Sequence, residues 1–168
     1  GSTIAITCAS GYLPIEKTYD CVQTLQQWGY NVLVGNTVGK QHHYFAGTEQ
    51  ERLQELQQML DNPNIHAILF GRGGYGLSQL IDALDFSAFV QHPKWLIGFS
   101  DVTIILNHVW QQLGIAGIHS SMAAAFASGG NTPDALQHLQ TLLSGSKTIV
   151  STEAHAYNKM GTVQGRLV

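Results

Sequence analysis

The sequence predicts an α/β domain built around a mostly parallel β-sheet. Two observations lead to this prediction: short apolar runs rich in β-branched and aromatic residues recur along the chain, and segments with helical spacing of apolar residues separate them. Strands that alternate with helices in this way are typical of βαβ units, in which neighbouring strands run parallel. The predicted strands are Thr3–Cys8, Asn31–Val34, Ile65–Phe70, Trp95–Phe99 and Ile115–Ile118.

The segments between these strands carry start and stop signals of helices. The first, Pro14–Gly29, opens with proline at an early helical position and ends at glycine. The second begins at Thr48, has Glu51 three residues later as in a capping box, and stops at Asn62-Pro63. The same reasoning predicts helices at Leu77–Leu84, Asp101–Leu113 and Pro133–Leu143.

Composition narrows the class of protein. The 168 residues include 8 basic and 11 acidic side chains, a formal charge of −3, and the basic residues are scattered, so no nucleic-acid partner is expected. No apolar run approaches the roughly 18 residues that span a bilayer, and the start of the chain lacks signal-peptide features, so no membrane partner is expected. With only two cysteines, Cys8 and Cys21, a reducing, cytoplasmic location fits best.

A glycine-rich stretch, Gly71–Gly76, follows the third predicted strand directly. Its four glycines let backbone N–H groups approach an anion or a developing oxyanion. The stretch also matches G-x-G-x-x-G, although the dinucleotide fingerprint belongs to the first strand–helix turn of its fold. Two other interpretations therefore stay open: a non-catalytic module that binds a nucleotide or anion here, and a tight turn that needs glycine for its geometry alone.

A serine, Ser100, follows the fourth predicted strand. It either caps the helix that begins at Asp101 or acts as a nucleophile on a sharp strand-to-helix turn. Because parallel strands end at one edge of a sheet, this turn and the glycine-rich stretch are expected to face each other. That pairing favours acyl transfer, in which Ser100 attacks a carbonyl and the amides of Gly74 and Asp101 hold the oxyanion. A base and an orienting acid are still required.

The histidines do not settle where that base lies. His119 ends the fifth predicted strand and could approach the same sheet edge, but it fits a role in the pocket wall better. The eight histidines and two cysteines show no spacing typical of metal ligands, so no metal is predicted.

The motifs resemble those of the LD-carboxypeptidases, also called muramoyltetrapeptide carboxypeptidases, a family that includes the microcin-immunity peptidases. The matching residues run in order from Tyr44-Phe45-Ala46-Gly47-Thr48 through Arg52, Ala67-Ile68, Arg72-Gly73-Gly74-Tyr75-Gly76, Leu84-Asp85-Phe86 and Pro93-Lys94 to Gly98-Phe99-Ser100-Asp101-Val102-Thr103.

The resemblance implies a fold and an activity. The fold is a flavodoxin-like or class I glutamine-amidotransferase-like parallel sheet with helices on both faces. The activity is that of a serine peptidase with a Ser-Glu-His triad, in which Ser100 matches the nucleophile. Such enzymes hydrolyse the L,D bond that releases terminal D-alanine from muropeptide tetrapeptides during cytoplasmic peptidoglycan recycling. No cofactor is implied, and members of the family commonly form homodimers.

The resemblance also implies how the chain is divided. Residues 1–150 match the N-terminal, nucleophile-bearing α/β domain, although Lys147–Ser151 resembles one more strand. Residues 151–168 match a linker into a C-terminal domain absent from this chain, which would supply the triad Glu and His. This fragment is therefore expected to be inactive by itself.

The substrate stays open. Gly73, Arg72, Tyr75 and His119 are expected to line the substrate pocket, but His119-Ser120-Ser121 stands where the family often has His-Gly-Pro. This departure leaves open whether diaminopimelate or lysine precedes the D-alanine. It also leaves open a microcin-immunity-type peptidase that cleaves a different amide, or a sensor that binds peptidoglycan fragments without turnover.

Overall fold

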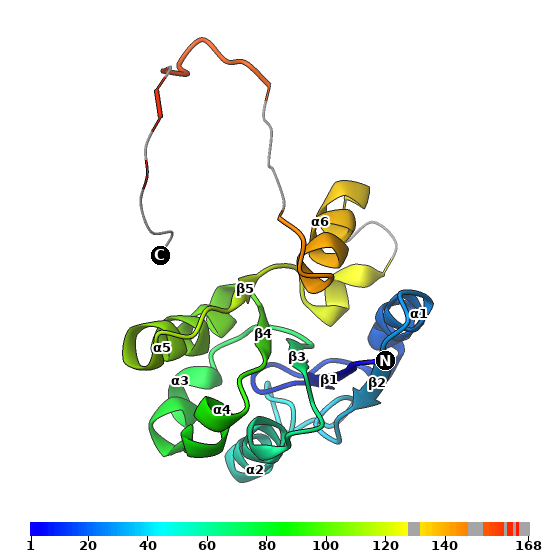
Figure 1. The fold of residues 1–168 in the computed structure, drawn as a ribbon. Coiled ribbons are helices and arrows are strands. Elements are labelled where there is room, and N and C mark those ends of the chain that lie inside the picture. The colour runs from blue at the N-terminus through cyan, green and yellow to red at the C-terminus, as the bar shows by residue number, and fades with distance from the viewer. Residues whose placement is uncertain (128–131, 148–152, 160, 163, 165–168) are drawn as a thin grey trace.

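The computed structural model describes residues 1–127, 132–147, 153–159, 161, 162 and 164. Within these residues a five-stranded sheet forms in the order β2-β1-β3-β4-β5, and every neighbouring pair is parallel (Figure 1). This is the flavodoxin-like order, which reverses direction between β1 and β3 and places ligands near that point. The strands are β1 (Thr3–Thr7), β2 (Asn31–Val34), β3 (Ala67–Phe70), β4 (Trp95–Gly98) and β5 (Ile118–His119).

Helices cover both faces of the sheet, so the predicted fold class is confirmed (Figure 1). One face packs against α2 (Glu49–Asp61), α3 (Leu77–Leu80), α4 (Ser87–Gln91) and α5 (Thr103–Leu113). The other face packs against α1 (Tyr19–Gln27), the 3-10 turn η4 (Ala123–Phe126) and α6 (Pro133–Leu143). Further 3-10 turns are η1 (Ile15–Thr18), η2 (Ile81–Ala83) and η3 (Ser100–Val102). No helix in the described part of the chain is long and apolar enough to cross a membrane.

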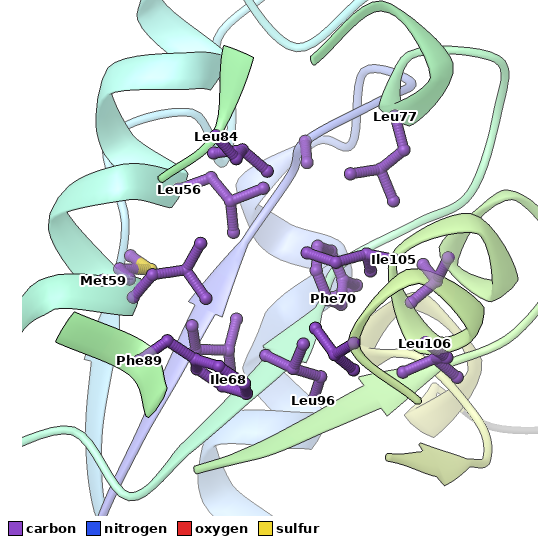
Figure 2. Packing of buried hydrophobic residues seen from close by; sticks show 14 of the residues in the cluster. Leu56, Met59, Ile68, Phe70, Leu77, Leu84, Phe89, Leu96, Ile105 and Leu106 are labelled. Carbon is purple, nitrogen blue, oxygen red and sulfur yellow. The ribbon is translucent and has the colours of Figure 1, made fainter. Parts of the chain in front are cut away.

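The core follows from the alternation of side chains along the strands. Ile68 and Phe70 of β3 face the layer of α2 to α5, whereas Leu69 between them faces the opposite layer. Figure 2 shows Ile68, Phe70 and Leu96 packed among side chains of the helices on their side of the sheet. Full burial of one such side chain contributes roughly 1.5–3 kcal/mol, so these contacts hold the sheet rigid beneath its loops.

The fifth strand differs from its prediction. Ile115–Ile118 was the predicted strand, but β5 pairs only through Ile118 and His119. The preceding residues close helix α5 instead: Gly114 adopts a left-handed conformation (φ 68°), and the N–H of Ile115 donates to the carbonyl of Val109 at 3.2 Å. These residues therefore complete the helix end before the chain joins the sheet.

Three predicted helices are also divided. Pro14–Gly29 forms η1 followed by α1, Leu77–Leu84 forms α3 followed by η2, and Asp101–Leu113 begins as the 3-10 turn η3 before it becomes α5. The short helix α4 was not predicted, because five residues are too few for a periodic pattern. The strand predicted at Lys147–Ser151 lies outside the described residues except for Lys147.

Helix α2 is anchored at both ends. At its start, the Thr48 hydroxyl accepts the Glu51 N–H and the Glu51 carboxylate accepts the Thr48 N–H at 2.8 Å, which is the predicted capping box. At its end, the buried ammonium of Lys94 donates to the carbonyls of Met59 and Asn62 at 3.0 and 2.6 Å. A cation at this position also opposes the negative end of the helix dipole.

The buried face of α2 carries a carboxylate, Glu55, which ties the helix to the end of β1. The Thr7 hydroxyl donates to Glu55 Oε1 at 2.7 Å, and the Thr37 N–H donates to Glu55 Oε2 at 3.0 Å. The Thr37 hydroxyl oxygen in turn accepts the Cys8 N–H at 2.9 Å. These bonds satisfy a carboxylate that would be costly to bury alone, and they fix the loop after β1 relative to α2.

The capping box predicts a pH dependence of stability. A hydrogen bond from Lys40 and, to a smaller extent, hydrogen bonds from Thr48 lower the pKa of Glu51 from 4.5 to about 2. A depressed folded-state pKa means that the stabilisation is present above pH 4.5 and is lost as the pH falls toward 2. The difference in unfolding free energy between the protein and Glu51→Gln should therefore be largest at neutral pH and should shrink through that window. Urea unfolding of both proteins at a series of pH values measures this difference in unfolding free energy.

A matched control is Glu16→Gln, because Glu16 is exposed in the first turn of η1 and has no such cap. Its effect on the unfolding free energy should not change across the same window. An effect of Glu51→Gln that stays constant from pH 7 to pH 2 would contradict the pairing.

Candidate active site

Ser100 occupies a strained position at the end of β4. Its φ is 61°, a left-handed conformation that non-glycine residues rarely adopt, and it follows Phe99 in extended conformation. Such a conformation costs on the order of 1–3 kcal/mol and persists only where surrounding contacts enforce it. The Ser100 side chain is exposed, and the N-cap position of the turn η3 is held by Phe99, so that Ser100 is the first residue inside the turn. The helix-cap interpretation of Ser100 is therefore wrong.

The glycine-rich stretch lies directly against this serine, as predicted. A Cβ atom built on Gly73 would lie 3.4 Å from both Cβ and Oγ of Ser100, and 3.5 Å from Cε of Met122. The backbone of Gly73 thus forms one wall of the space around the hydroxyl. A side chain at this position would occupy space directly beside Oγ.

Gly74 requires glycine for its conformation and its contacts. Its φ is 153°, and a Cβ atom there would lie 3.0 Å from the Gly11 nitrogen and 3.2 Å from the Tyr44 hydroxyl. Among the described residues, the backbone N–H groups of Gly74 and Asp101 have no hydrogen-bond acceptor. These are the two amides that the sequence suggested for an oxyanion hole.

Side chains from distant parts of the chain connect three segments of the site: the loop after β1, the glycine-rich stretch after β3 and the turn that carries Ser100. The carboxylate of Asp101 accepts the hydroxyl of Ser10, from the loop after β1, and the N–H of Leu77 at 3.1 Å. Arg52 of α2, only 1% exposed, donates to the carbonyl of Ala9 at 2.8 Å and to that of Gly76 at 3.4 Å. Its guanidinium also lies over the ring of Phe45, 4.6 Å from the ring centre.

Arg72 and Tyr75 lie on the side of the glycine-rich stretch that faces the loop after β1. Arg72 donates to the carbonyl of Tyr12 at 3.0 Å, and its guanidinium is 5.9 Å from the ring centre of Tyr44. Tyr75 is 77% exposed, and its ring centre is 6.5 Å from that of Tyr44. Together with Tyr44 they form an exposed rim beside Gly74.

His119 lies on the other side of the serine. It pairs with Gly98 in the parallel register of β4 and β5. Its side chain is exposed, and the centre of its ring lies 6.2 Å from that of Phe99 with the two rings tilted by 48°. This places His119 at the sheet edge that the sequence predicted, beside the strand end that carries Ser100.

The electrostatics exclude a competing nucleophile. Cys8 lies beside Gly71 in the same loop region, but burial, together with the nearby carboxylate of Glu55, raises the pKa of its thiol to about 12. Cys8 is therefore a neutral thiol near pH 7 and acts as a small core residue. Burial likewise lowers the pKa of Arg52, while Glu49 and Asp101 act in the opposite direction.

Other surface features lie away from this site. An open hollow of about 520 Å³ lies at the opposite edge of the sheet, where it is lined by residues that precede β3, β4 and β5, among them His66, Trp95 and Ile115. In the described part of the chain, no three His, Cys, Asp or Glu side chains gather closely enough to hold a metal ion.

Sequence reasoning missed Ser10 and Met122. Ser10-Gly11 follows the first strand as a polar residue and a glycine, so the rule that ligands bind at the carboxyl ends of parallel strands could have indicated it. Met122 carries no sequence signal of this kind, because it contributes an apolar side chain from the loop after β5.

Comparison with known proteins places these motifs in a family. Residues 4–120 match the model described as the LD-carboxypeptidase N-terminal domain. A putative carboxypeptidase of Synechocystis is 34% identical over 172 residues, which covers 100% of this chain and 54% of that protein. The murein tetrapeptide carboxypeptidase of Pseudomonas aeruginosa is 35% identical over 121 residues, which covers 71% of this chain and 39% of that protein. The chain thus spans about half, or less, of the length of these curated relatives.

Solved structures agree with the match. The muramoyltetrapeptide carboxypeptidase from Oxalobacter formigenes superposes with a TM-score of 0.75 at 26% identity, over 85% of this chain and 48% of that one. A variant of the microcin C7 self-immunity protein MccF, in complex with adenosine monophosphate, superposes with a TM-score of 0.76 at 26% identity, over 88% of this chain and 45% of that one. On its fold, its motifs and its match over residues 4–120, the chain belongs to the LD-carboxypeptidase family.

Proposed function

We propose that this chain is the nucleophile-bearing part of a serine LD-carboxypeptidase that releases terminal D-alanine from muropeptide tetrapeptides. One observation carries the proposal: an exposed serine is held at a φ of 61° at the end of a central parallel strand, with the backbone of Gly73 against its hydroxyl. A strained, exposed serine on a strand-to-helix turn is the arrangement of a nucleophile elbow. Named relatives of the chain include a probable murein peptide carboxypeptidase and a murein tetrapeptide carboxypeptidase.

In the proposed acyl transfer, the Ser100 hydroxyl and the two backbone N–H groups each take part in a defined step. The Ser100 hydroxyl adds to the carbonyl carbon of the L,D bond and loses its proton to a base. The N–H groups of Gly74 and Asp101 hold the carbonyl oxygen as it becomes an oxyanion. The intermediate then collapses: the C–N bond breaks, and D-alanine leaves as the amine with a proton returned by the base. The acyl-serine ester that remains reacts with water, which releases the shortened peptide and restores the hydroxyl.

The base is the part of the mechanism that these loops leave open. Ser100 has no hydrogen-bonded histidine among the described residues, and a serine hydroxyl is a weak nucleophile without one. The proposal therefore assigns the triad Glu and His to the half of the relatives' length that this chain does not span. Covering of the exposed Phe99, Tyr44 and Tyr75 by that half would also enclose the acyl-enzyme, so that its ester meets only the water that hydrolyses it.

The rim residues are proposed to bind the substrate. Arg72 presents a guanidinium beside the glycine-rich stretch, where it can attract the terminal carboxylate of a peptide. Tyr75 and His119 present exposed rings on the two sides of the serine, against which the rest of the peptide can pack.

A second candidate follows from the same comparisons. The microcin C7 self-immunity protein MccF matches this chain as well as the murein enzymes do, both in sequence and in fold. A peptidase of that type would use the same serine on a different amide.

The geometry disfavours the alternative of a nucleotide-binding module. Helix α3 has only four residues, and its first N–H already donates to the carboxylate of Asp101. A phosphate at this position would meet a negative charge instead of a free helix N-terminus.

The proposed function makes a prediction about the nucleophile. The full-length gene product should remove a single alanine from a muropeptide that ends in D-alanine, and Ser100→Ala should remove none. Mass spectrometry of the incubated peptide measures the loss. The 168-residue chain by itself should be inactive, because no histidine in the part of it that the structure describes is hydrogen-bonded to Ser100.

The same assay separates the candidates. An inactive full-length product on this peptide, with Ser100-dependent cleavage of an aminoacyl sulfamoyl nucleoside, would favour the microcin-immunity type. Activity that survives in Ser100→Ala would overturn both.

A separate prediction concerns the wall that Gly73 forms beside the Ser100 hydroxyl. In Gly73→Ala the added methyl group meets its neighbours at 3.4 Å or more, so the fold should accept it. The same methyl lies beside the hydroxyl, so kcat/KM for D-alanine release should fall by about 10²-fold, the cost of a misplaced reacting group. Steady-state kinetics and the urea midpoint measure the two effects.

Gly161→Ala is the matched control, because no residue that the structure describes lies within 4 Å of a Cβ at that position. It should leave both quantities unchanged. Full activity of Gly73→Ala would show that the substrate does not approach Ser100 from this side.

A further inference from the structure

Two opposite charges hold a single peptide group at the end of the glycine-rich stretch. The peptide between Gly76 and Leu77 presents its carbonyl to Arg52 Nη1 at 3.4 Å and its N–H to Asp101 Oδ2 at 3.1 Å. Hydrogen bonds to ionised groups are about twice as strong as those between neutral groups. This peptide is therefore fixed in orientation from both sides.

The same two charges hold the loop after β1. Arg52 Nη1 also donates to the Ala9 carbonyl at 2.8 Å, and Asp101 Oδ2 also accepts the Ser10 hydroxyl. We call Arg52, Asp101 and these four backbone and side-chain partners the two-charge clamp. Gly76 is essential to it, because a Cβ at that position would lie 2.5 Å from Arg52 Nη1 and 2.7 Å from the Ala9 carbonyl oxygen.

The clamp reaches the serine through Asp101, which follows it in the chain. Ser100 has a φ of 61°, and a strained conformation needs contacts on its neighbours that hold it. Within the described residues the Ser100 side chain has no hydrogen bond that could do this. The two hydrogen bonds to the carboxylate fix Asp101, the residue immediately after the strained Ser100. They connect it to the loop after β1 and to the end of the glycine-rich stretch.

We propose that the side chain of Asp101 is a positioning residue for the acyl-transfer site, acting through Ser10 and the Leu77 N–H to hold the Ser100 elbow against the Gly73–Gly74 backbone. This inference rests on the proposed function. It is separate from the role of the Asp101 backbone N–H in the oxyanion hole, because a change of side chain leaves that N–H in place.

The proposal distinguishes two substitutions at the same position. Asp101→Ala removes both hydrogen bonds. Asp101→Asn keeps an oxygen that can accept both, while its NH₂ group takes the place of Oδ1, for which the described residues offer no hydrogen-bond partner. Partial rescue by asparagine is therefore expected of a positioning role.

The test uses the full-length gene product with Asp101→Ala, Asp101→Asn and the control Asp85→Ala. Asp85 is a fair control because its exposed carboxylate accepts the N–H and hydroxyl of Ser87 at the start of α4, the same kind of contact away from the site. In D-alanine release, Asp101→Ala should lower kcat by about 10²-fold, with KM changed by no more than about threefold. Asp101→Asn should recover at least about tenfold of that loss, and Asp85→Ala should keep full activity.

A kcat of Asp101→Ala within about threefold of the unmodified protein would overturn the proposal, and so would a loss confined to KM. An equal loss in Asp101→Ala and Asp101→Asn would overturn it as well.

A second readout separates this proposal from the proposed function. Amide hydrogen exchange at Leu77 should be at least about tenfold faster in Asp101→Ala than in Asp85→Ala, and a crystal structure of Asp101→Ala should show Ser100 away from its φ of 61° or the glycine-rich stretch displaced. These results hold whether or not the peptide is a substrate. An unmodified protein inactive on every D-alanine peptide rejects the proposed function alone, whereas unchanged exchange at Leu77 with an unchanged Ser100 backbone rejects the clamp.

Discussion

The site depends on one peptide group, that between Gly76 and Leu77, held between the guanidinium of Arg52 and the carboxylate of Asp101. Through these two charges the loop after β1, the glycine-rich stretch after β3 and the serine elbow after β4 are connected to one another. Removing either side chain would leave the peptide group between Gly76 and Leu77 with one hydrogen-bond partner fewer. The strained φ of Ser100 depends on this arrangement, because nothing in its own side chain stabilises it.

The fold explains why these loops meet. In the order β2-β1-β3-β4-β5, the strands β1, β3 and β4 are neighbours, so their carboxyl ends lie side by side where the sheet reverses direction. Helix α2 enters this edge from one face, anchored by its capping box at the start and by Lys94 at the end, and it brings Arg52 and Glu55 beneath the loops. Polar anchors inside the molecule thus fix the loops that carry the chemistry, while the apolar core fixes the strands beneath them.

The sequence allowed prediction of the fold class, of four strands to within two residues and of the meeting of Ser100 with the glycine-rich stretch, because each has a local pattern. It could not predict the clamp, because Ser10 and Asp101 are 91 residues apart and Arg52 and Ala9 are 43 apart, and no local spacing relates such pairs. Strand β5 starts later than predicted, since only the backbone shows that the N–H of Ile115 still belongs to the end of α5. The left-handed conformation of Ser100 agrees with the sharp strand-to-helix turn that was one of its two interpretations, and Gly74, at a φ of 153°, is one of four glycines in its stretch.

The most direct test of the account is to find where a covalent acyl-enzyme mimic attaches. The full-length gene product would be treated with a fluorophosphonate, which labels serines activated as nucleophiles, and the labelled peptide would be sequenced by tandem mass spectrometry. The account predicts a label on Ser100, blocked by the D-alanine peptide and strongly reduced in Asp101→Ala. A label on another serine, or D-alanine release that continues with Ser100 replaced by alanine, would contradict it.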